Sequence, residues 1–213
     1  MKTQIYFSVI SQRDNINPYL PRSAELFKSD KKLFVAGSTW SADESILEGL
    51  FEDINKEYKM IVVPHEINEL KIEKLKKRFG NAAIRYSQWD QKSTNAQVLI
   101  IDNIGMLSAL YQYADLAYIG GGFGKGIHNI LEAVVYGTPV FFGPNYRKFR
   151  EADELVHWKG AFSVKNEKEL RNRVFEITQE PGRIEKIKEI NKRYINNNKG
   201  ATELIINYLK LNP

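Results

Sequence analysis

The chain has 213 residues, enough for one large domain or two small ones. Hydrophobic residues make up 43% of it and aromatic residues 12%, so it can bury a sizeable core. No run approaches the roughly twenty apolar residues of a membrane span, and the first residues lack the features of a secretory signal peptide. Without cysteine there are no disulfides or thiolate metal sites, and the three scattered histidines predict no metal cluster.

The net charge of +5 reflects 31 basic and 26 acidic residues. Much of the excess lies at residues 71–78 and 186–193, both on predicted helices that also carry glutamates. Such helices usually present a solvated face. Nucleic-acid binding is a weaker interpretation because no known nucleic-acid-binding motif is present. An anionic membrane surface would also attract these faces.

From residue 33 onward, short apolar runs alternate with amphipathic helical patterns. The predicted strands occupy residues 33–36, 60–63, 83–86, 98–101, 116–119, 140–142 and 161–164. Helices are expected at 42–58, 67–79, 106–113, 127–137 and 149–158, followed by three more helical patterns; Ser41 and Glu44 form a capping box for the first. This alternation predicts a Rossmann-like α/β domain, with a parallel sheet of about six strands covered by helices on both faces.

The first thirty residues do not follow this alternation. Residues 1–10 are compatible with one strand, and residues 15–21 form a proline-containing loop. We therefore assign residues 1–32 to a linker or edge segment and residues 33–213 to the Rossmann-like domain.

The segment 118–144 carries the most information. It predicts a strand, a glycine-rich loop, a helix from near Ile127 that ends at a left-handed Gly137, and a further strand. On such a helix His128, Asn129 and Glu132 share one face, which can hydrogen-bond a polar ligand. The loop is not a P-loop and occurs too late in the chain for a dinucleotide fingerprint. One alternative is that its glycines only let a strand and helix pack closely, but the neighbouring polar residues favour a ligand site.

Other polar or small residues follow further predicted strands. Because parallel strands end at one edge of a sheet, these segments are expected to converge on one cleft with the glycine loop. Each segment alone has a simpler reading, as a helix cap or a surface loop. The candidate residues at these strand ends are Ser38, Thr39, Pro64, His65, Gly105 and Met106.

The run IDNIGMLSALYQYADLAYIGGGF, the later run HNILEAVVYGTPVFFGP, the upstream GST and the downstream FREADELVHWKGAFSV together resemble the C-terminal half of the bacterial 3-deoxy-D-manno-octulosonic acid (Kdo) transferases. The resemblance covers roughly residues 33–165. It implies a GT-B glycosyltransferase that transfers Kdo from CMP-Kdo to a lipid A precursor in lipopolysaccharide biosynthesis, with inversion and without a bound metal or cofactor.

The resemblance also implies residue roles. Ser38 and Thr39 stand where the family's G-S-T loop approaches the nucleotide phosphate. Asn129 and Glu132 match nucleotide-binding residues, with Glu132 holding ribose hydroxyls. The helix start at Gly105 and Met106 would meet the cytidine or its phosphate.

Two departures from the family pattern concern the phosphate. The family's Pro-Arg-His-Pro is Pro-His-Glu-Ile at residues 64–67, so the expected arginine is absent and His65 is the candidate substitute. The glycine pair before His-Asn is Gly126-Ile127, in a loop that looks one residue shorter. Lys125 is a second candidate cation, with a solvated loop lysine as the alternative.

The resemblance places the family's catalytic base and most acceptor contacts in an N-terminal domain that these residues do not match. We therefore expect no catalytic residue within this chain and no transfer by the chain alone. The implied location is the cytoplasmic face of the inner membrane, with peripheral attachment in this half.

Two other functions stay open. One is a nucleotide-sugar-binding domain of another GT-B transferase or an epimerase that uses a UDP-sugar. The other is a non-catalytic, membrane-peripheral module that acts through its basic helices. Whether the chain prefers a uracil or a cytosine nucleotide distinguishes a UDP-sugar enzyme from a Kdo transferase. Failure to bind any nucleotide favours the non-catalytic module.

Overall fold

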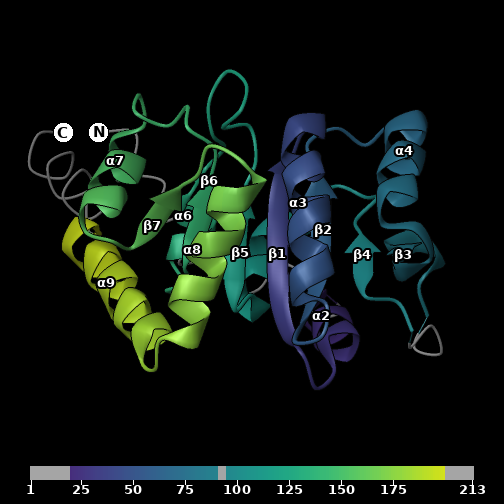
Figure 1. The fold of residues 1–213 in the computed structure, drawn as a ribbon, viewed down its shortest axis with the longest axis horizontal. Helices are drawn as coiled ribbons and strands as arrows, with labels where there is room; N and C mark the ends of the chain where they lie inside the picture. Colours follow the sequence, from purple (N-terminus) through teal and green to yellow (C-terminus); the bar gives the residue numbers. More distant parts are fainter. Residues whose placement is uncertain (1–19, 91–94, 200–213) are drawn as a thin grey trace, which may run out of the picture.

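The computed structural model describes residues 20–90 and 95–199. Within them a seven-stranded, all-parallel sheet has the order β3-β4-β2-β1-β5-β6-β7 (Figure 1). The strands are β1 (Lys32–Thr39), β2 (Tyr58–Pro64), β3 (Ala83–Arg85), β4 (Val98–Ile100), β5 (Leu116–Ile119), β6 (Val140–Phe142) and β7 (Ala161–Ser163). The predicted parallel α/β fold is confirmed, with seven strands in place of about six.

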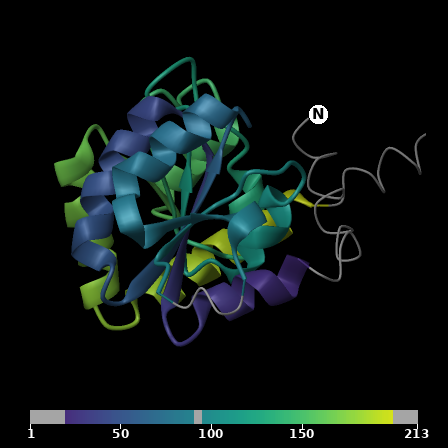
Figure 2. The same cartoon turned by 90° about the vertical axis from the view of Figure 1, so that its right-hand side faces the viewer.

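Helices cover both faces of the sheet, which runs between the two layers in Figure 2. One face is covered by α3 (Ser41–Ile54), α4 (Glu69–Phe79) and α8 (Glu167–Gln179), whose apolar residues share one buried cluster. The opposite face is covered by α2 (Leu20–Lys28), α5 (Leu107–Leu110), α6 (Leu131–Val134), α7 (Arg150–His157) and α9 (Arg183–Asn198). Short 3₁₀ turns occupy Gly80–Ala82, Tyr86–Gln88 and Tyr111–Tyr113.

The strand order reverses between β1 and β5. The chain moves outward from β1 to β2, returns past β4, and then crosses to pair β5 with the other side of β1. In open α/β sheets, a ligand crevice forms where the order reverses, beyond the carboxyl ends of the two strands. Here that point lies after Thr39 and Ile119, where the glycine loop begins.

Several predicted boundaries shift. The helix expected at 42–58 ends at Ile54, because Tyr58 already begins β2. The predicted capping box also moves by one residue: Ser41 is the first helical residue, and the Asp43 carboxylate accepts a hydrogen bond from the Trp40 backbone N–H at 2.9 Å. A carboxylate at the third helical position satisfies a backbone donor that the helix leaves free.

The helix predicted from Ile127 is wrong in its first turn. Residues 127–130 are not helical, and α6 has only four residues. The backbone N–H of His128 bonds to the Gly120 carbonyl at 3.1 Å, so this stretch stays tied to the end of β5. The Asn129 side chain then accepts a hydrogen bond from Leu131 N–H, at the start of the short helix, at 3.1 Å. His128 therefore does not share a helix face with Glu132, although Gly137 has the expected positive φ of 82°.

Helix α2 falls within the segment 1–32 that we assigned to a linker or edge. Its Ala24 and Phe27 are 1% exposed and belong to the main core. Lys28 forms an ion pair with Asp115 at 2.7 Å, which ties α2 to the start of β5. The division at residue 32 stays a prediction. The proposed strand at 1–10 and the third C-terminal helical pattern lie outside the described residues.

Candidate functional site

A cavity of about 530 Å³ lies at the reversal point of the sheet. One wall is the turn from β1 into α3, with Trp40, Ala42 and Asp43. The other wall is the loop after β5, from Gly121 to His128. Its volume is in the range of small-molecule sites, and its position is the one that the fold favours for ligands.

Asp43 joins the two walls. Its side chain is fully buried and accepts hydrogen bonds from the Tyr118 hydroxyl at 2.8 Å and from Gly121 N–H at 3.0 Å, besides the Trp40 N–H. Burial, followed by the neighbouring Asp43 carboxylate, raises the pKa of Tyr118. Tyr118 therefore stays a neutral donor. A buried carboxylate with three donors holds the ends of β1 and β5 at a set separation.

Several glycines of the loop are each required for their own structural reason. A Cβ on Gly120 would lie 2.2 Å from the Ser38 carbonyl oxygen, and one on Gly122 would lie 2.6 Å from the Gly143 nitrogen. Gly121 has a φ of 91°. Close packing, which the sequence left as an alternative, therefore explains part of the motif. These contacts also shape the cavity wall, so the packing and ligand readings are compatible.

Three aromatic rings cluster at the rim of the cavity. His65 stacks on Trp40 with ring centroids 4.5 Å apart and lies tilted against His128 with centroids 4.3 Å apart. Trp40 Nε1 donates to His128 Nε2 at 3.3 Å, which makes that histidine nitrogen an acceptor. Burial, with a smaller effect from His65, lowers the pKa of His128. At neutral pH the ring cluster therefore presents a neutral His128 ring.

Trp40 is 39% exposed, a large fraction for an indole on a folded domain. On its other side is a smaller cavity of about 170 Å³, lined by Thr39, Pro64 and Lys71 among others. Trp40 thus lines two hollows at the strand ends, and the exposed part of its ring is available to a ligand.

The structure brings most predicted site residues to this edge. Ser38 has a φ of 53°, in the left-handed region, at the point where the β1–β2 register shifts. Thr39 is 2% exposed and donates to Glu44 at 3.4 Å. Pro64 pairs with Thr39 in the sheet, and His65 follows it into the ring cluster. Lys125 is exposed and lines the larger cavity.

Asn129 and Glu132 lie together behind the loop. Asn129 Nδ2 donates to Glu132 Oε1 at 3.2 Å, and both side chains are half-buried. Burial, with a contribution from the Glu132 carboxylate, raises the pKa of Tyr111. The Tyr111 hydroxyl packs against Gly37 in β1, so closely that a Cβ on Gly37 would lie 2.0 Å from it. Because Glu132 is near the same hydroxyl, Glu132 also lies near the end of β1.

Met106 differs from the expectation that it packs against a base. Its side chain is 4% exposed and belongs to the core. Gly105, immediately before it, is exposed with a φ of 93°. The Met106 side chain therefore leaves little surface for a ligand, whereas the backbone at Gly105 is exposed.

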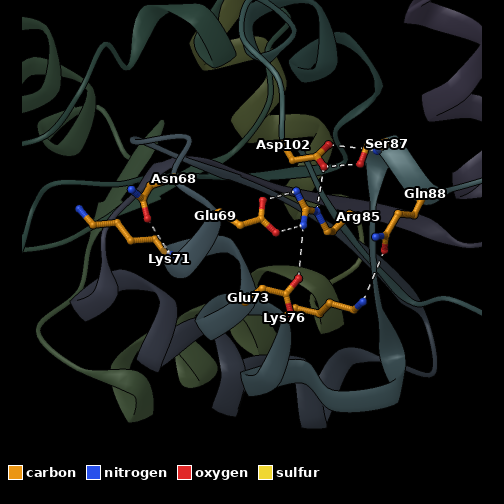
Figure 3. Close-up of polar contacts among 9 residues, drawn as sticks. All are labelled: Asn68, Glu69, Lys71, Glu73, Lys76, Arg85, Ser87, Gln88 and Asp102. Carbon is orange, nitrogen blue, oxygen red and sulfur yellow. Dashed lines mark hydrogen bonds and ion pairs between the residues drawn. The ribbon is translucent and has the colours of Figure 1, made fainter.

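The loop that carries Gly105 starts from a rigid charged cluster (Figure 3). The Asp102 side chain is 2% exposed and accepts from Arg85 Nε at 2.9 Å and from Ser87. Burial opposes ionisation of Asp102, but the hydrogen bonds from Ser87 and Arg85 outweigh it and lower its pKa. Arg85 also pairs with Glu69 and Glu73 of α4, which joins β3, β4 and α4.

Sequence reasoning missed Trp40, Asp43 and Lys148. Lys148 donates to the Lys125 carbonyl and so brings a second cation to the loop. A signal existed for Asp43, since it is the third residue of α3 if the cap is Trp40 rather than Ser41. None existed for Lys148 or the ring cluster, because they depend on contacts between distant segments.

Among the described residues, no group of three histidine or acidic side chains is placed to hold a metal ion. No helix in the described part of the chain combines the length and apolar character needed to cross a bilayer.

Comparison with known proteins agrees with this arrangement. No protein-family model matches the chain. A Kdo transferase of Aquifex aeolicus is 34% identical over 173 residues, which are 77% of this chain and 48% of that protein. A bifunctional glycosyltransferase/methyltransferase of Fusobacterium nucleatum is 32% identical over 163 residues, 74% of this chain and 25% of that protein. The chain thus spans about half or less of the length of these curated relatives.

Among solved structures, the C-terminal CMP-Kdo-binding domain of WaaA from Acinetobacter baumannii superposes with a TM-score of 0.73 at 21% identity, covering 84% of this chain and 99% of that domain. Anabaena HepE in complex with UDP-glucose gives 0.62 at 14% identity, over 86% of this chain and 49% of that one. Fold and cleft define the Rossmann-like C-terminal domain of a GT-B glycosyltransferase. Within that class, the sequence matches show that the chain belongs to the Kdo transferase family.

Proposed function

We propose that the cavity between the β1–α3 turn and the loop after β5 binds CMP-Kdo, as the donor side of an inverting glycosyltransferase in lipopolysaccharide synthesis. The observation that carries the proposal is the cavity of about 530 Å³ at the reversal of strand order, in a chain related to Kdo transferases. The acceptor in this proposal is a lipid A precursor, reached at the cytoplasmic surface of the inner membrane through peripheral attachment.

The described side chains supply what a nucleotide sugar requires. The exposed part of the Trp40 ring offers a flat surface to a base or sugar face. Lys125, together with Lys148, supplies positive charge for the phosphate in place of the arginine that the family pattern leads us to expect. Ser38 and Thr39 approach from the end of β1, and Glu132 accepts from ribose hydroxyls.

Titration calorimetry with CMP, CDP, UMP and UDP tests the proposal. We expect CMP to bind and UMP to bind more weakly. UMP binding as tight as CMP binding would favour a UDP-sugar enzyme instead. Failure to bind any of the four, together with binding to anionic vesicles, would favour the non-catalytic membrane-peripheral module.

Glu132→Ala tests the ribose contact. We expect CMP affinity to fall at least tenfold, because each hydrogen bond to a charged group contributes roughly 1.5–3 kcal/mol. Glu185→Ala, at an exposed position of α9, is the matched control and should leave CMP affinity unchanged. If Glu132 is only structural, the mutation instead lowers the melting temperature and leaves CMP affinity near that of the control.

A further inference from the structure

A second cavity, of about 560 Å³, lies against β7 at the outer edge of the sheet. Its lining residues come from the segment after β6, from α7, β7 and the residues that follow them, and from α8 and the start of α9; Figure 1 shows where these elements lie. None of the residues that line the donor cavity lines this one. Its size suits a small molecule.

The cavity has a strong excess of positive charge. Only one carboxylate lines it, and Arg173 is paired with that carboxylate at 2.6 Å. The other four cations have no ion-pair partner among residues 20–90 and 95–199. The charged residues of the lining are Arg147, Lys159, Lys165, Arg173, Arg183 and Glu176. Like charges around one hollow repel one another, so an anion between them is favoured.

Two details distinguish this hollow from a solvated basic face. The Nε of Arg183 is buried and has no hydrogen-bond partner among the described residues. A buried donor without a partner is costly, so the guanidinium of a residue that lines the cavity is held at a free-energy cost. The floor is apolar and aromatic, and Arg173 lies over the Phe162 ring with 5.5 Å between its guanidinium carbon and the ring centroid. This stacking orients one cation of the cavity.

Lys159 gives an independent indication. It follows Trp158, the C-cap of α7, and has a φ of 61°, a left-handed conformation that glycine adopts at little cost and lysine does not. Its side chain nevertheless lines the cavity. Backbone strain at a residue that lines a site is a reason to look for a ligand there.

We propose that the cavity beside β7 binds a phosphorylated ligand with at least two anionic groups, at a site separate from the donor cavity. Four unpaired cations match the charge of two phosphate groups, each of which carries about 1.5–2 negative charges at neutral pH. The ligand is either a soluble phosphorylated molecule or the headgroup of an anionic lipid. Both present the same chemistry to these side chains.

Pyrophosphate and lipid vesicles are the probes. We expect the 213-residue chain to bind pyrophosphate in calorimetry at low ionic strength, with affinity that falls as salt screens the charges. The triple variant Arg147→Gln/Lys165→Gln/Arg183→Gln should lose at least tenfold in affinity. A matched control, Lys168→Gln/Lys186→Gln, removes exposed cations of α8 and α9 that do not line the cavity and should bind as the wild type does.

Lys159→Gly should raise the melting temperature and lower the affinity for pyrophosphate. Glycine relieves the left-handed strain, so the melting temperature should rise, while loss of the ammonium weakens pyrophosphate binding. A purely structural role for Lys159 predicts the rise in melting temperature without any loss of affinity.

Further comparisons locate the site and the source of the ligand. Saturating CMP and the Lys125→Gln variant should leave pyrophosphate binding unchanged, because both affect the donor cavity. Sedimentation with cardiolipin vesicles, whose headgroup carries two phosphates, is compared with sedimentation with phosphatidylcholine vesicles. A lipid headgroup is identified if the wild type binds cardiolipin and the triple variant does not. The proposal is overturned if neither probe binds, if the triple variant binds like its control, or if CMP displaces the pyrophosphate.

Discussion

At the scale of single residues, the donor cavity depends on Asp43 more than on any residue that sequence reasoning selected. Its carboxylate accepts from backbone groups on both walls, at Trp40 and Gly121, and from the Tyr118 hydroxyl. A charged acceptor is tolerated in the interior only when it has such partners. Removing it leaves buried donors without an acceptor, which costs more than the loss of one average hydrogen bond.

Asp43→Ala should therefore lower the free energy of unfolding by about 3 kcal/mol or more and also weaken CMP binding, because the two walls separate. Urea denaturation and calorimetry measure the two effects. Glu44→Ala is the comparison, since the Glu44 side chain accepts a long hydrogen bond of 3.4 Å from Thr39, and it should cost about 1 kcal/mol or less. Equal effects of the two substitutions would contradict the role given to Asp43.

Asp102 leads to a prediction about pH. Its pKa in the folded chain lies below the ordinary value of 3.8, so the unfolded chain binds the proton more readily. The resulting stability is fully present above pH 3.8 and is lost as the pH falls through the lower folded value. Asp102→Asn should cost about 2 kcal/mol at pH 7, measured by urea denaturation, and this cost should decrease as the pH falls below 3.8. A cost independent of pH would show that the carboxylate's charge is unimportant.

At the scale of elements, the loop between β5 and α6 needs a glycine backbone at one position and also lines the cavity, and mutations can separate these two requirements. Gly121 needs a positive φ, and a Cβ there would lie 2.5 Å from the Gly126 carbonyl oxygen. Gly124 has neither constraint, since its nearest contact would be 3.6 Å away. Both residues line the cavity, so they differ in backbone requirement and not in location.

Gly121→Ala should therefore distort the loop, reduce stability by about 1–3 kcal/mol and lower CMP affinity at least tenfold. Gly124→Ala should change stability by less than about 1 kcal/mol, because its backbone conformation suits alanine. Thermal unfolding and calorimetry on both variants test the distinction. If Gly121→Ala leaves stability and CMP affinity unchanged, the loop has room to relax and does not require a glycine at this position.

At the scale of the whole molecule, one buried side chain anchors α9 to the sheet. Asn191 is fully buried, and its Nδ2 donates to the carbonyls of Thr138 and Gly160 at 2.9 Å and 3.1 Å, with Gly137 at 3.4 Å. These carbonyls precede β6 and β7, so one amide connects a C-terminal helix to two strands. The same helix begins at Arg183, beside the cationic cavity.

Asn191→Asp should destabilise the domain by about 3 kcal/mol or more, because a carboxylate replaces the donor and faces carbonyl oxygens in the interior. Asn197→Asp makes the same chemical change at an exposed position of α9 and should alter stability by less than about 0.5 kcal/mol. Chemical denaturation of both variants at pH 7 provides the measurement. If both behave alike, α9 does not depend on this amide for its attachment.

The sequence by itself determined the class of fold and the edge at which the site lies. Apolar runs of three or four residues, separated by helical patterns, permit little except a parallel sheet, and all its strands end on one side. The predicted strands at 60–63, 116–119 and 140–142 therefore lie within or coincide with β2, β5 and β6. The site residues at strand ends, such as Thr39 and His65, followed from that geometry.

Only the tertiary structure decided how the site is assembled. The helix expected from Ile127 lacks its first turn because the His128 N–H bonds to the Gly120 carbonyl. Local helix propensity does not predict this hydrogen bond. Met106 goes to the core rather than to a ligand, and Trp40 stacks on His65 and approaches His128, 88 residues away. Such contacts join segments that are distant in the chain, and their energies depend on the burial that the finished fold creates.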